Sequence, residues 1–426
     1  MRSAASLIAI AWRRRLVDHP CPNLHGYRSM NHYRLGRAVL SSKGSRWQRT
    51  GHPWTFRDDI AELDEGRGHL VEVFGHKGHR LGIATWSPES KIALRMIEPG
   101  ATAEIPDLQA FFRQRLEAAI RRRRPLEAET DAWRILSSEA DGLPGYIVDR
   151  YAEVLVLQSL TPFAERYLGI LVPLLVERLE PEMILARNDV GVRRLEGLPQ
   201  VVELLHGRRI PRVRIEEHGL RLEIDPYKGQ KTGFFLDQRP ARKLVETLCA
   251  EYGGPVLDLC SYTGGFTLHA ARGGAQSVLS VDQSQDALDE IRSAATRNDL
   301  DGIDTLRGNV FDLVKQLLHE GRRFRGIVLD PPAFAKSRRE VQGATRGYQD
   351  LNSKSLRLLE PGGWLLTCSC SYNMTPELFL AMLRKSAARA GVACLDHGRL
   401  GPAVDHPVPL NLPEADYLKV HHLERR

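Results

Sequence analysis

The second half of the sequence places polar residues where the ends of strands are predicted. Asp282 and Asp330 each follow a short apolar run whose length suits a buried parallel strand, and Asn309 follows a short predicted strand at 304–306. In open α/β sheets, ligands bind at the carboxyl ends of such strands. A carboxylate there can accept hydrogen bonds from ribose hydroxyls. The amide of Asn309 can both donate to and accept from the amino edge of adenine. These residues predict a nucleoside-binding site.

Two cysteines end a further apolar run, 364–371. Strand alternation puts Cys368 and Cys370 on the same side of that strand. Free cysteine is usually buried and inert, but a thiol across from Asp330 is also a candidate nucleophile. Asp330 begins an Asp-Pro-Pro sequence, in which the prolines fix an extended backbone and remove two N–H donors. Free carbonyls and the carboxylate can then face a planar, hydrogen-bonding base.

The element that positions these groups spans residues 256–282. It reads as a strand, a turn at Gly264-Gly265, a helix over 266–272 and a second strand. The pattern lacks the three spaced glycines that admit a pyrophosphate. A cofactor with a ribose but no pyrophosphate fits better, and S-adenosylmethionine is the common one. Another nucleotide ligand and a purely structural βαβ unit stay open.

Composition bounds the organisation of the chain. A length of 426 residues predicts two or three domains. The net charge of +7 comes with many arginines, which suit phosphate contacts, although a compositional bias would give the same excess. The six cysteines are not spaced as zinc ligands are, and they are too few for a disulfide-stabilised scaffold of this length. This pattern favours location in the reducing cytoplasm. No apolar run approaches a membrane span, and no metal site is predicted.

The N-terminal third shows short strands and turns. Residues 1–31 are predicted to be a disordered extension, with an organelle-targeting peptide as the alternative. Residues 32–103 predict a small β-barrel, in which basic residues interleave with aromatic ones. Such a mixture can pack bases and phosphates, but Trp54 and Phe56 alternate on one strand face and can equally be core. The candidate RNA contacts are Arg46, Arg49, His52 and Trp54.

Between the barrel and the nucleotide unit, residues 104–214 read as an α+β module without a catalytic signature. A helix over 107–124 ends in the run Arg121–Arg124, which suits either RNA phosphates or a solvated helix end. The later segment 227–239 mixes glycines, aromatics and charges. Its two phenylalanines, Phe234 and Phe235, either flank a flat base or belong to a core.

Taken together, these segments resemble the bacterial 23S ribosomal RNA cytosine-5 methyltransferase family of the RlmI type. The resemblance implies a multidomain α/β protein: a PUA-like RNA-binding domain at 32–103, a central α+β domain at 104–214 and a Rossmann-like class I methyltransferase domain at 215–426. The matching segments are Gly51-His52-Pro53-Trp54-x-Phe56, Asp141-Gly142-Leu143-Pro144-Gly145, 231–239, 258–266, Asp330-Pro331-Pro332-Ala333-Phe334 and Ser369-Cys370-Ser371.

The resemblance also implies the site. Cys370 is the expected catalytic cysteine, assisted by Asp330. Cys368 competes because other RNA cytosine-5 enzymes use Thr-Cys-Ser, which Thr367 begins here. The family commonly has Asp where this chain has Asn309, and many RNA cytosine-5 enzymes have cysteine where it has Ala333, so the acceptor of the C5 proton is unassigned. The implied S-adenosylmethionine contacts are Asp237, Arg239, Asp258, Tyr262, Thr263, Gly264, Phe266, Asp282, Asn309 and Asp330.

The implied chemistry is methylation of cytosine C5 through a covalent cysteine–C6 adduct. The target in 23S ribosomal RNA must be unpaired or flipped to be reached. One alternative is an amino-methyltransferase that uses the Asp-Pro-Pro turn without a cysteine. Another is a non-catalytic RNA-binding or assembly factor. No membrane partner is expected, and a homodimer is left open.

Overall fold

The computed structural model describes residues 34–105, 107–335 and 338–426, so the predicted extension at 1–31 lies outside the described residues. These residues fall into two compact units. The first comprises the chain up to Arg214 with Ile224–Phe234 and Pro409–Leu412, and the second comprises Ile215–Glu223, Phe235–Val408 and Pro413–Arg426. No helix of the described part of the chain is long and apolar enough to cross a membrane.

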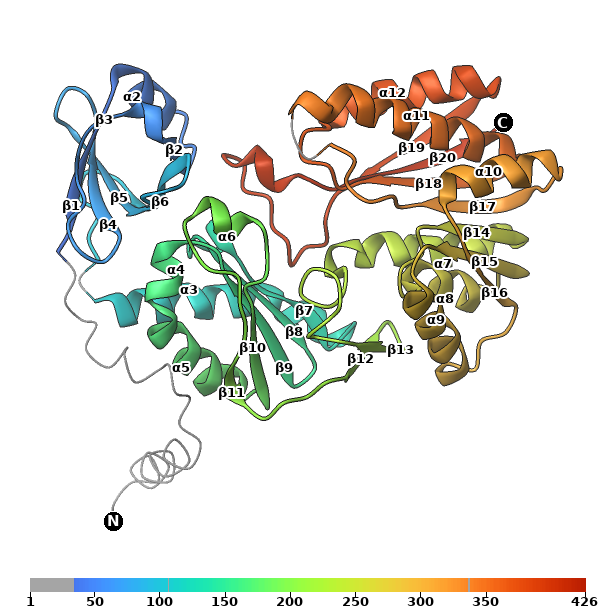
Figure 1. The fold of residues 1–426 in the computed structure, drawn as a ribbon, viewed down its shortest axis with the longest axis horizontal. Coiled ribbons are helices and arrows are strands. Elements are labelled where there is room, and N and C mark those ends of the chain that lie inside the picture. Colours follow the sequence, from blue (N-terminus) through green and yellow to red (C-terminus); the bar gives the residue numbers. More distant parts are fainter. Residues whose placement is uncertain (1–33, 106, 336–337) are drawn as a thin grey trace, which may run out of the picture. The chain divides into compact units, whose positions relative to one another are not determined.

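The first sheet of unit one has six strands in the order β2-β6-β5-β4-β1-β3 (Figure 1). Apolar side chains that alternate along β1, β4 and β5 form its core, as in Ala38, Leu40, Val71 and Val73. The short helix α2 (Ser42–Gln48) follows β1 and is capped by the hydroxyl of Ser41. The strands are β1 (Gly36–Leu40), β2 (Trp54–Phe56), β3 (Ile60–Asp64), β4 (Leu70–Phe74), β5 (Arg80–Trp86) and β6 (Ile92–Pro99).

The second sheet of unit one has five strands in the order β11-β10-β9-β8-β7. Its helices supply a large apolar core with the sheet, centred on Phe112, Phe163 and Tyr167. The helix predicted over 107–124 is present, with Asp107 as its N-cap. The elements are α3 (Leu108–Arg123), β7 (Ala132–Ser137), β8 (Tyr146–Tyr151), β9 (Val154–Ser159), α4 (Pro162–Arg166), α5 (Leu168–Leu179), β10 (Met183–Arg187), α6 (Val192–Leu195) and β11 (Val202–Gly207).

Unit two is built on a seven-stranded sheet in the order β16-β15-β14-β17-β18-β20-β19. The first five strands are parallel, and β20 pairs antiparallel with β18 and with β19. The strands are β14 (Pro255–Leu259), β15 (Ser277–Asp282), β16 (Ile303–Arg307), β17 (Phe324–Leu329), β18 (Leu359–Ser369), β19 (Cys394–Leu400) and β20 (Lys419–Arg425). A hairpin of β12 (Val213–Glu217) and β13 (Leu220–Ile224) precedes them in the chain, and its residues divide between the two units.

Helices cover both faces of this sheet (Figure 1). Side chains alternate along β14: Leu257 and Leu259 pack with α10, α11 and α12, whereas Val256 packs with α7 and α8. The doubly wound fold predicted for this part is therefore confirmed. The helices are α7 (Arg239–Tyr252), α8 (Gly265–Arg272), α9 (Gln285–Arg297), α10 (Val310–His319), α11 (Val341–Leu358) and α12 (Pro376–Ala390).

One pair of residues fixes the contact between β17 and β18. Gly326 lies opposite Trp364 in the parallel register. The Trp364 ring is fully buried and crosses the position of the missing side chain, so that a Cβ at 326 would come within 2.2 Å of ring atom Cζ2. The absence of a side chain at 326 therefore leaves room for the indole of Trp364 over the backbone of β17.

Candidate active site

The strand order of unit two brings the predicted polar residues to one edge of the sheet. β14 lies between β15 and β17, and β17 lies beside β18. Asp282 ends β15, Asp330 follows β17, and Cys370 follows β18. The backbone N–H of Asp330 donates to the carbonyl of Leu259 at 3.3 Å, which ties the Asp-Pro-Pro turn to the end of β14. The structure therefore brings these residues to one edge of the sheet, as the sequence predicts.

Asp258 places a carboxyl group inside this edge. Its Oδ2 accepts from the Thr267 hydroxyl at 2.7 Å, while Oδ1 is buried and has no hydrogen-bond partner among the described residues. Burial, with the nearby charges of Asp330 and Asp282, raises the pKa of Asp258 to about 7. A buried carboxylate oxygen without a donor suits a ligand that brings a cation or an N–H group, as the amino group of S-adenosylmethionine would.

The glycine turn is strained where it meets Asp282. Gly264 has φ +82°, and a Cβ there would come within 2.7 Å of Ile291 Cγ1. Cys260 and Tyr262 also have positive φ, at 64° and 47°, although neither is a glycine. Such conformations cluster at functional sites because the surrounding structure must hold them. The turn is held in part by Asp282, since the Tyr262 N–H donates to its Oδ2 at 3.0 Å.

Asp282 and Asn309 are oriented by the backbone around them. The second oxygen of Asp282 accepts from the Ser284 N–H at 2.9 Å, and each carboxylate oxygen keeps a further lone pair for a ribose hydroxyl. Asn309 is exposed and caps α10, because its Oδ1 accepts from the Phe311 N–H at 2.9 Å. Its amide N–H groups have no partner in the described part of the chain, so they can face a ligand.

The two cysteines of β18 differ in exposure. Cys368 is fully buried in the core beneath α7 and α8, and burial raises the pKa of its thiol well above the usual range. Cys370 is half-buried and lies just past the last residue of the strand. Burial likewise raises the pKa of Cys260, in the glycine turn, together with nearby carboxylates. Cys370 is thus the better exposed of the two candidate nucleophiles.

Three residues absent from the sequence-based assignments organise this edge. Gln238 is buried and donates from Nε2 to Asp330 Oδ2 at 3.0 Å. The Tyr348 hydroxyl, on α11, is 3.1 Å from both the Ser369 and the Ser371 hydroxyls, which flank Cys370. Lys419, the first residue of β20, donates to the Ser371 carbonyl at 2.8 Å. Only Gln238 had a signal in the sequence, as a member of the 231–239 segment.

Other predicted cofactor contacts have protein partners or core positions. Asp237 is buried and accepts from the Tyr417 hydroxyl at 2.5 Å, and buried Arg239 forms an ion pair with Asp405 at 2.8 Å. Phe266 belongs to the core, whereas Thr263 and Tyr262 are half-buried in the turn. Their roles as cofactor contacts stay predictions. Phe234 is core in unit one, and Phe235 packs edge-on against Tyr262 in unit two, with ring centroids 5.5 Å apart.

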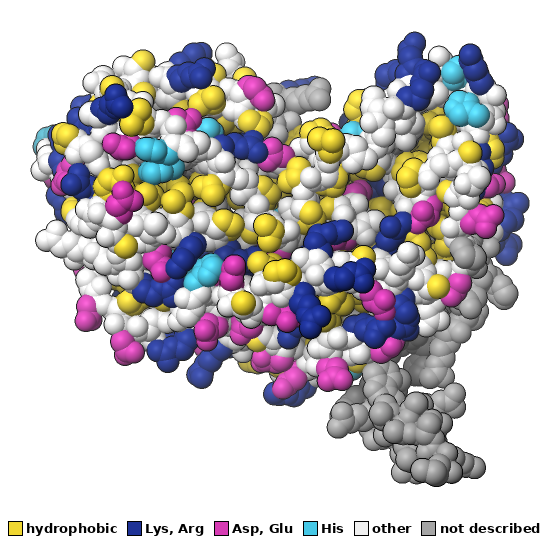
Figure 2. All heavy atoms as spheres, turned by 180° about the vertical axis from the view of Figure 1, so that it is seen from behind, with side chains coloured by type: hydrophobic (Ala, Val, Ile, Leu, Met, Phe, Trp, Pro, Cys, Tyr) yellow, Lys and Arg dark blue, Asp and Glu magenta, His cyan; other side chains and the backbone are white. Residues whose placement is uncertain are grey.

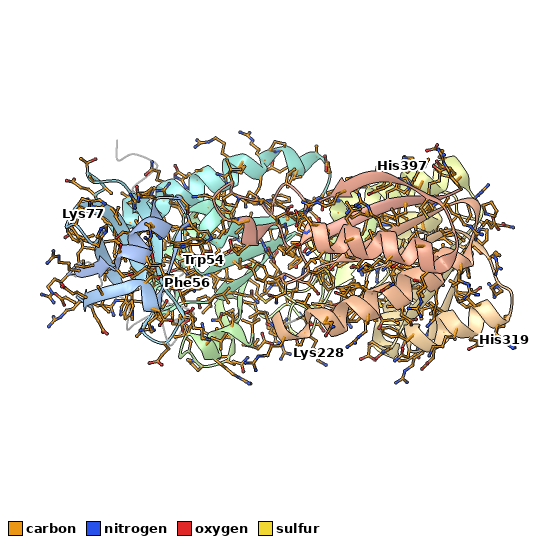
Figure 3. All side chains as sticks on the ribbon, turned by 90° about the horizontal axis from the view of Figure 1, so that it is seen from above. Trp54, Phe56, Lys77, Lys228, His319 and His397 are labelled. Carbon is orange, nitrogen blue, oxygen red and sulfur yellow. The ribbon has the colours of Figure 1, made fainter. Side chains whose placement is uncertain are left out.

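The candidate RNA contacts lie on α2, β2 and the turn between them, in unit one. His52 is buried and accepts from the Trp54 N–H at 3.1 Å, and the Trp54 indole donates to Glu139 at 2.9 Å. Trp54 is half-buried and Phe56, labelled beside it in Figure 3, is 39 % exposed, so the interpretation of Phe56 as core was wrong. Arg46 and Arg49 are exposed, and neither forms an ion pair within the described ranges.

The remaining basic features are dispersed. Of the run Arg121–Arg124, Arg123 is buried and makes a two-pronged ion pair with Asp141, which Arg122 also contacts. Those two guanidinium groups therefore serve the fold. Figure 2 shows Lys and Arg side chains interspersed with Asp and Glu on the face that it draws, so the positive excess is not gathered into one patch there.

A doubly wound sheet with acids at successive strand ends, joined to a PUA-like sheet, defines a class I S-adenosylmethionine-dependent methyltransferase. A sequence model of S-adenosylmethionine-dependent methyltransferases matches residues 193–410, and one of PUA-like domains matches residues 38–99. The chain belongs to the ribosomal RNA large subunit methyltransferase I family. It is 41 % identical over 377 residues to that protein from Shewanella frigidimarina, covering 86 % of this chain and 94 % of the relative. It is 39 % identical over 394 residues to that of Cronobacter sakazakii, covering 90 % and 98 %.

Solved structures share the fold. A candidate SAM-dependent methyltransferase from Streptococcus mutans superposes with a TM-score of 0.77 at 21 % identity, covering 91 % of this chain and 99 % of that one. A candidate methyltransferase solved with SAH superposes with a TM-score of 0.79 at 22 % identity and the same coverage. At this identity the likeness concerns the fold, and it agrees with the architecture described above.

Proposed function

We propose that this chain methylates C5 of an unpaired or flipped cytosine in large-subunit ribosomal RNA, with Cys370 as the nucleophile. The observation that carries the proposal is the position of Cys370. Its thiol is half-buried beyond the end of β18, next to the strand that leads into Asp330, whereas Cys368 is enclosed in the core. The relatives named above are ribosomal RNA methyltransferases, which supports the substrate.

The proposed chemistry assigns one task to each residue. Cytosine C5 is a poor nucleophile, and addition of the Cys370 thiolate at C6 turns C5 into an enamine carbon. Bound S-adenosylmethionine supplies the methyl group that this carbon takes. Asp330, held by Gln238, faces the N3 edge of the base; as the carboxylic acid it donates its proton to N3 when negative charge develops there, and it takes the proton back when the adduct breaks down. Loss of the C5 proton to water then lets the thiolate leave C6, since the sequence has alanine at 333.

We place the cofactor between the glycine turn and the ends of β14, β15 and β16. The unpartnered Oδ1 of Asp258 would receive its amino group, Asp282 its ribose hydroxyls, and Asn309 its adenine edge. Two supports come from the geometry: Asp258 has acceptor capacity and Asn309 has donor capacity that no described residue takes up. Free thiols at Cys249, Cys260, Cys368, Cys370 and Cys394 suit the reducing cytoplasm in which ribosomes are modified.

The test is a trapped adduct. Large-subunit ribosomal RNA that carries 5-fluorocytidine cannot lose a proton from C5, so the adduct should persist after methyl transfer and migrate as a protein–RNA band. We expect the band with wild-type protein and with Cys368→Ala, and no band with Cys370→Ala. Mass spectrometry of unmodified RNA should find 5-methylcytosine. A methylated exocyclic amine made by Cys370→Ala would instead support the amino-methyltransferase alternative, and S-adenosylmethionine binding without any methylated product would support a non-catalytic factor.

We further propose that residues 32–103 form the RNA-binding domain, 104–214 the central domain and 215–426 the methyltransferase domain, with Arg46 and Arg49 contacting phosphates. Both guanidinium groups are exposed and without protein ion pairs. Removal of either arginine should reduce the slope of log affinity against log salt by about one, because one phosphate is then no longer neutralised. The pair Arg46→Glu and Arg49→Glu should weaken RNA binding, while Lys77→Glu, in an exposed turn of the same sheet, should not (Figure 3).

A further inference from the structure

Lys419 has a buried ammonium group without a carboxylate partner. It begins β20, lies opposite Ser369 in the pairing with β18, and is 0 % exposed. Its Nζ donates to two backbone carbonyls, of Ser371 at 2.8 Å and of Tyr417 at 2.6 Å. No carboxylate of the described chain forms an ion pair with it. Buried charges are normally paired, so this cation lacks the partner that a purely structural lysine would have.

Two acidic groups act on Lys419: the carboxylate of Asp416, which is paired with Arg399, and the thiol of Cys370. Burial lowers the pKa of Lys419 to about 8, whereas the charges of Cys370 and of Asp416 act to raise it and Arg399 acts to lower it. The Lys419 ammonium group donates to the carbonyl of Ser371, the residue directly after Cys370. This hydrogen bond fixes the positive charge beside the turn that carries the thiol. A cation held next to a cysteine favours the thiolate.

The other titratable groups around Cys370 cannot supply this charge. Tyr348, on α11, binds both flanking serines, and burial raises its pKa to about 12, so it stays a neutral donor. Cys368, on the same strand, is buried and neutral, because burial raises its pKa. Asp330, after β17, is an acid. Arg399, on β19, is a further cation, and its guanidinium is paired with Asp416. Lys419, on β20, is therefore the cation beside this turn that has no carboxylate partner in the described chain.

We infer that Lys419 is a positioning residue that holds Cys370 as a thiolate while its two carbonyl contacts fix the turn after β18. The thiol proton passes to solvent, the sulfur keeps the electron pair, and the ammonium keeps its three protons. The inference rests on the proposed function, in which Cys370 attacks C6. It adds the reason why this thiol is ionised before RNA binds.

The experiment measures Cys370 directly. Wild-type protein is treated with iodoacetamide across a pH series, and the alkylation rate of the Cys370 peptide is followed by mass spectrometry, which separates it from Cys394 and Cys260. We expect the rate to rise with a midpoint below the value of about 8.5 for a free thiol. In Lys419→Met the midpoint should rise, and the rate at about pH 7 should fall at least about tenfold while the rate at high pH is kept. Lys419→Arg should keep the wild-type midpoint.

The matched control is Lys354→Met on α11, which removes a lysine that is paired with Asp350. Its midpoint should equal that of the wild type. A wild-type midpoint at or above about 8.5 overturns the inference without any variant, which covers the case in which Lys419→Met does not fold. Equal midpoints in wild type and folded Lys419→Met overturn it as well. Alkylation needs neither RNA nor cofactor, so it tests the effect of Lys419 on Cys370 separately from the proposed function. If Lys419→Met raises the midpoint but Cys370→Ala still methylates RNA, the proposed function is refuted, whereas the interaction between Lys419 and Cys370 is supported.

Discussion

Replacement of Asp258 by asparagine should stabilise the free protein and weaken cofactor binding. A carboxyl with a pKa of about 7 in the folded chain and about 3.9 when unfolded binds its proton more tightly when folded. As the pH rises from about 4 to about 7, ionisation of Asp258 therefore lowers the free energy of unfolding. The loss is complete above that window and amounts to about 4 kcal/mol. Asparagine stays neutral, so Asp258→Asn escapes this loss.

The difference between variant and wild type isolates Asp258, because every other titrating group is common to both. Between about pH 5 and about pH 8, the stability advantage of Asp258→Asn should grow by about 3 kcal/mol. Denaturant titrations of variant and wild type at both pH values measure this difference in the free energy of unfolding. Hydrogen exchange of the peptide that contains β14 reports unfolding in these titrations. If the ionised carboxylate receives the cofactor's amino group, wild-type affinity for S-adenosylmethionine should also rise roughly fivefold from about pH 6 to about pH 7. In calorimetry, Asp258→Asn should bind more weakly and lack that rise.

Asp282→Asn is the matched control at the end of the adjacent strand. Both oxygens of Asp282 accept from backbone N–H groups, and asparagine keeps only one acceptor oxygen. We therefore expect this variant to lose about 1–3 kcal/mol at about pH 5. At about pH 8 the loss should be smaller, because removal of the Asp282 charge also lowers the pKa of Asp258. An advantage of Asp258→Asn that is the same at both pH values, with an unchanged pH profile of cofactor binding, would refute the reasoning.

Three further outcomes are expected. Gln238→Leu should keep the fold but lower kcat about tenfold with little change in KM for RNA, because the carboxylate of the Asp-Pro-Pro turn loses a donor; steady-state kinetics checks it. Arg123→Met should cost unit one about 3–5 kcal/mol by leaving a buried aspartate without its two-pronged partner, whereas Arg122→Met, half-exposed on the same carboxylate, should cost less than about 1 kcal/mol in denaturant titration. Gly326→Ala should destabilise unit two by at least about 2 kcal/mol because its Cβ meets Trp364, and Trp364→Leu in the same chain should recover part of that loss in thermal melts.

Local signals in the sequence were enough to place the polar edge of the site. The glycine turn, Asp282 and Asp330 each depend on residues within a few positions, and the structure has them at strand ends as predicted. Strand alternation also put Cys368 and Cys370 on one face, and both pack toward the core beneath α7 and α8. Exposure, which separates the two thiols, depends on tertiary packing and has no local signature.

Partners distant in the sequence account for what could not be predicted. Lys419 reaches the carbonyl of Ser371, and Tyr348 reaches the hydroxyls on either side of Cys370, across spans of tens of residues. β20 enters the sheet between β18 and β19 although it follows both in the chain, and no turn or glycine pattern announces that order. Arg239 illustrates the same effect, because its partner Asp405 lies on a remote segment.

The contact between Gly326 and Trp364 also has an evolutionary consequence. A tryptophan at 364 and a side chain at 326 exclude each other, so position 326 cannot change while the tryptophan is present. A lineage that keeps the indole must keep the glycine, and one that gains alanine at 326 must first have accepted a smaller residue at 364. The two positions should therefore vary together among relatives, with tryptophan and alanine never found side by side.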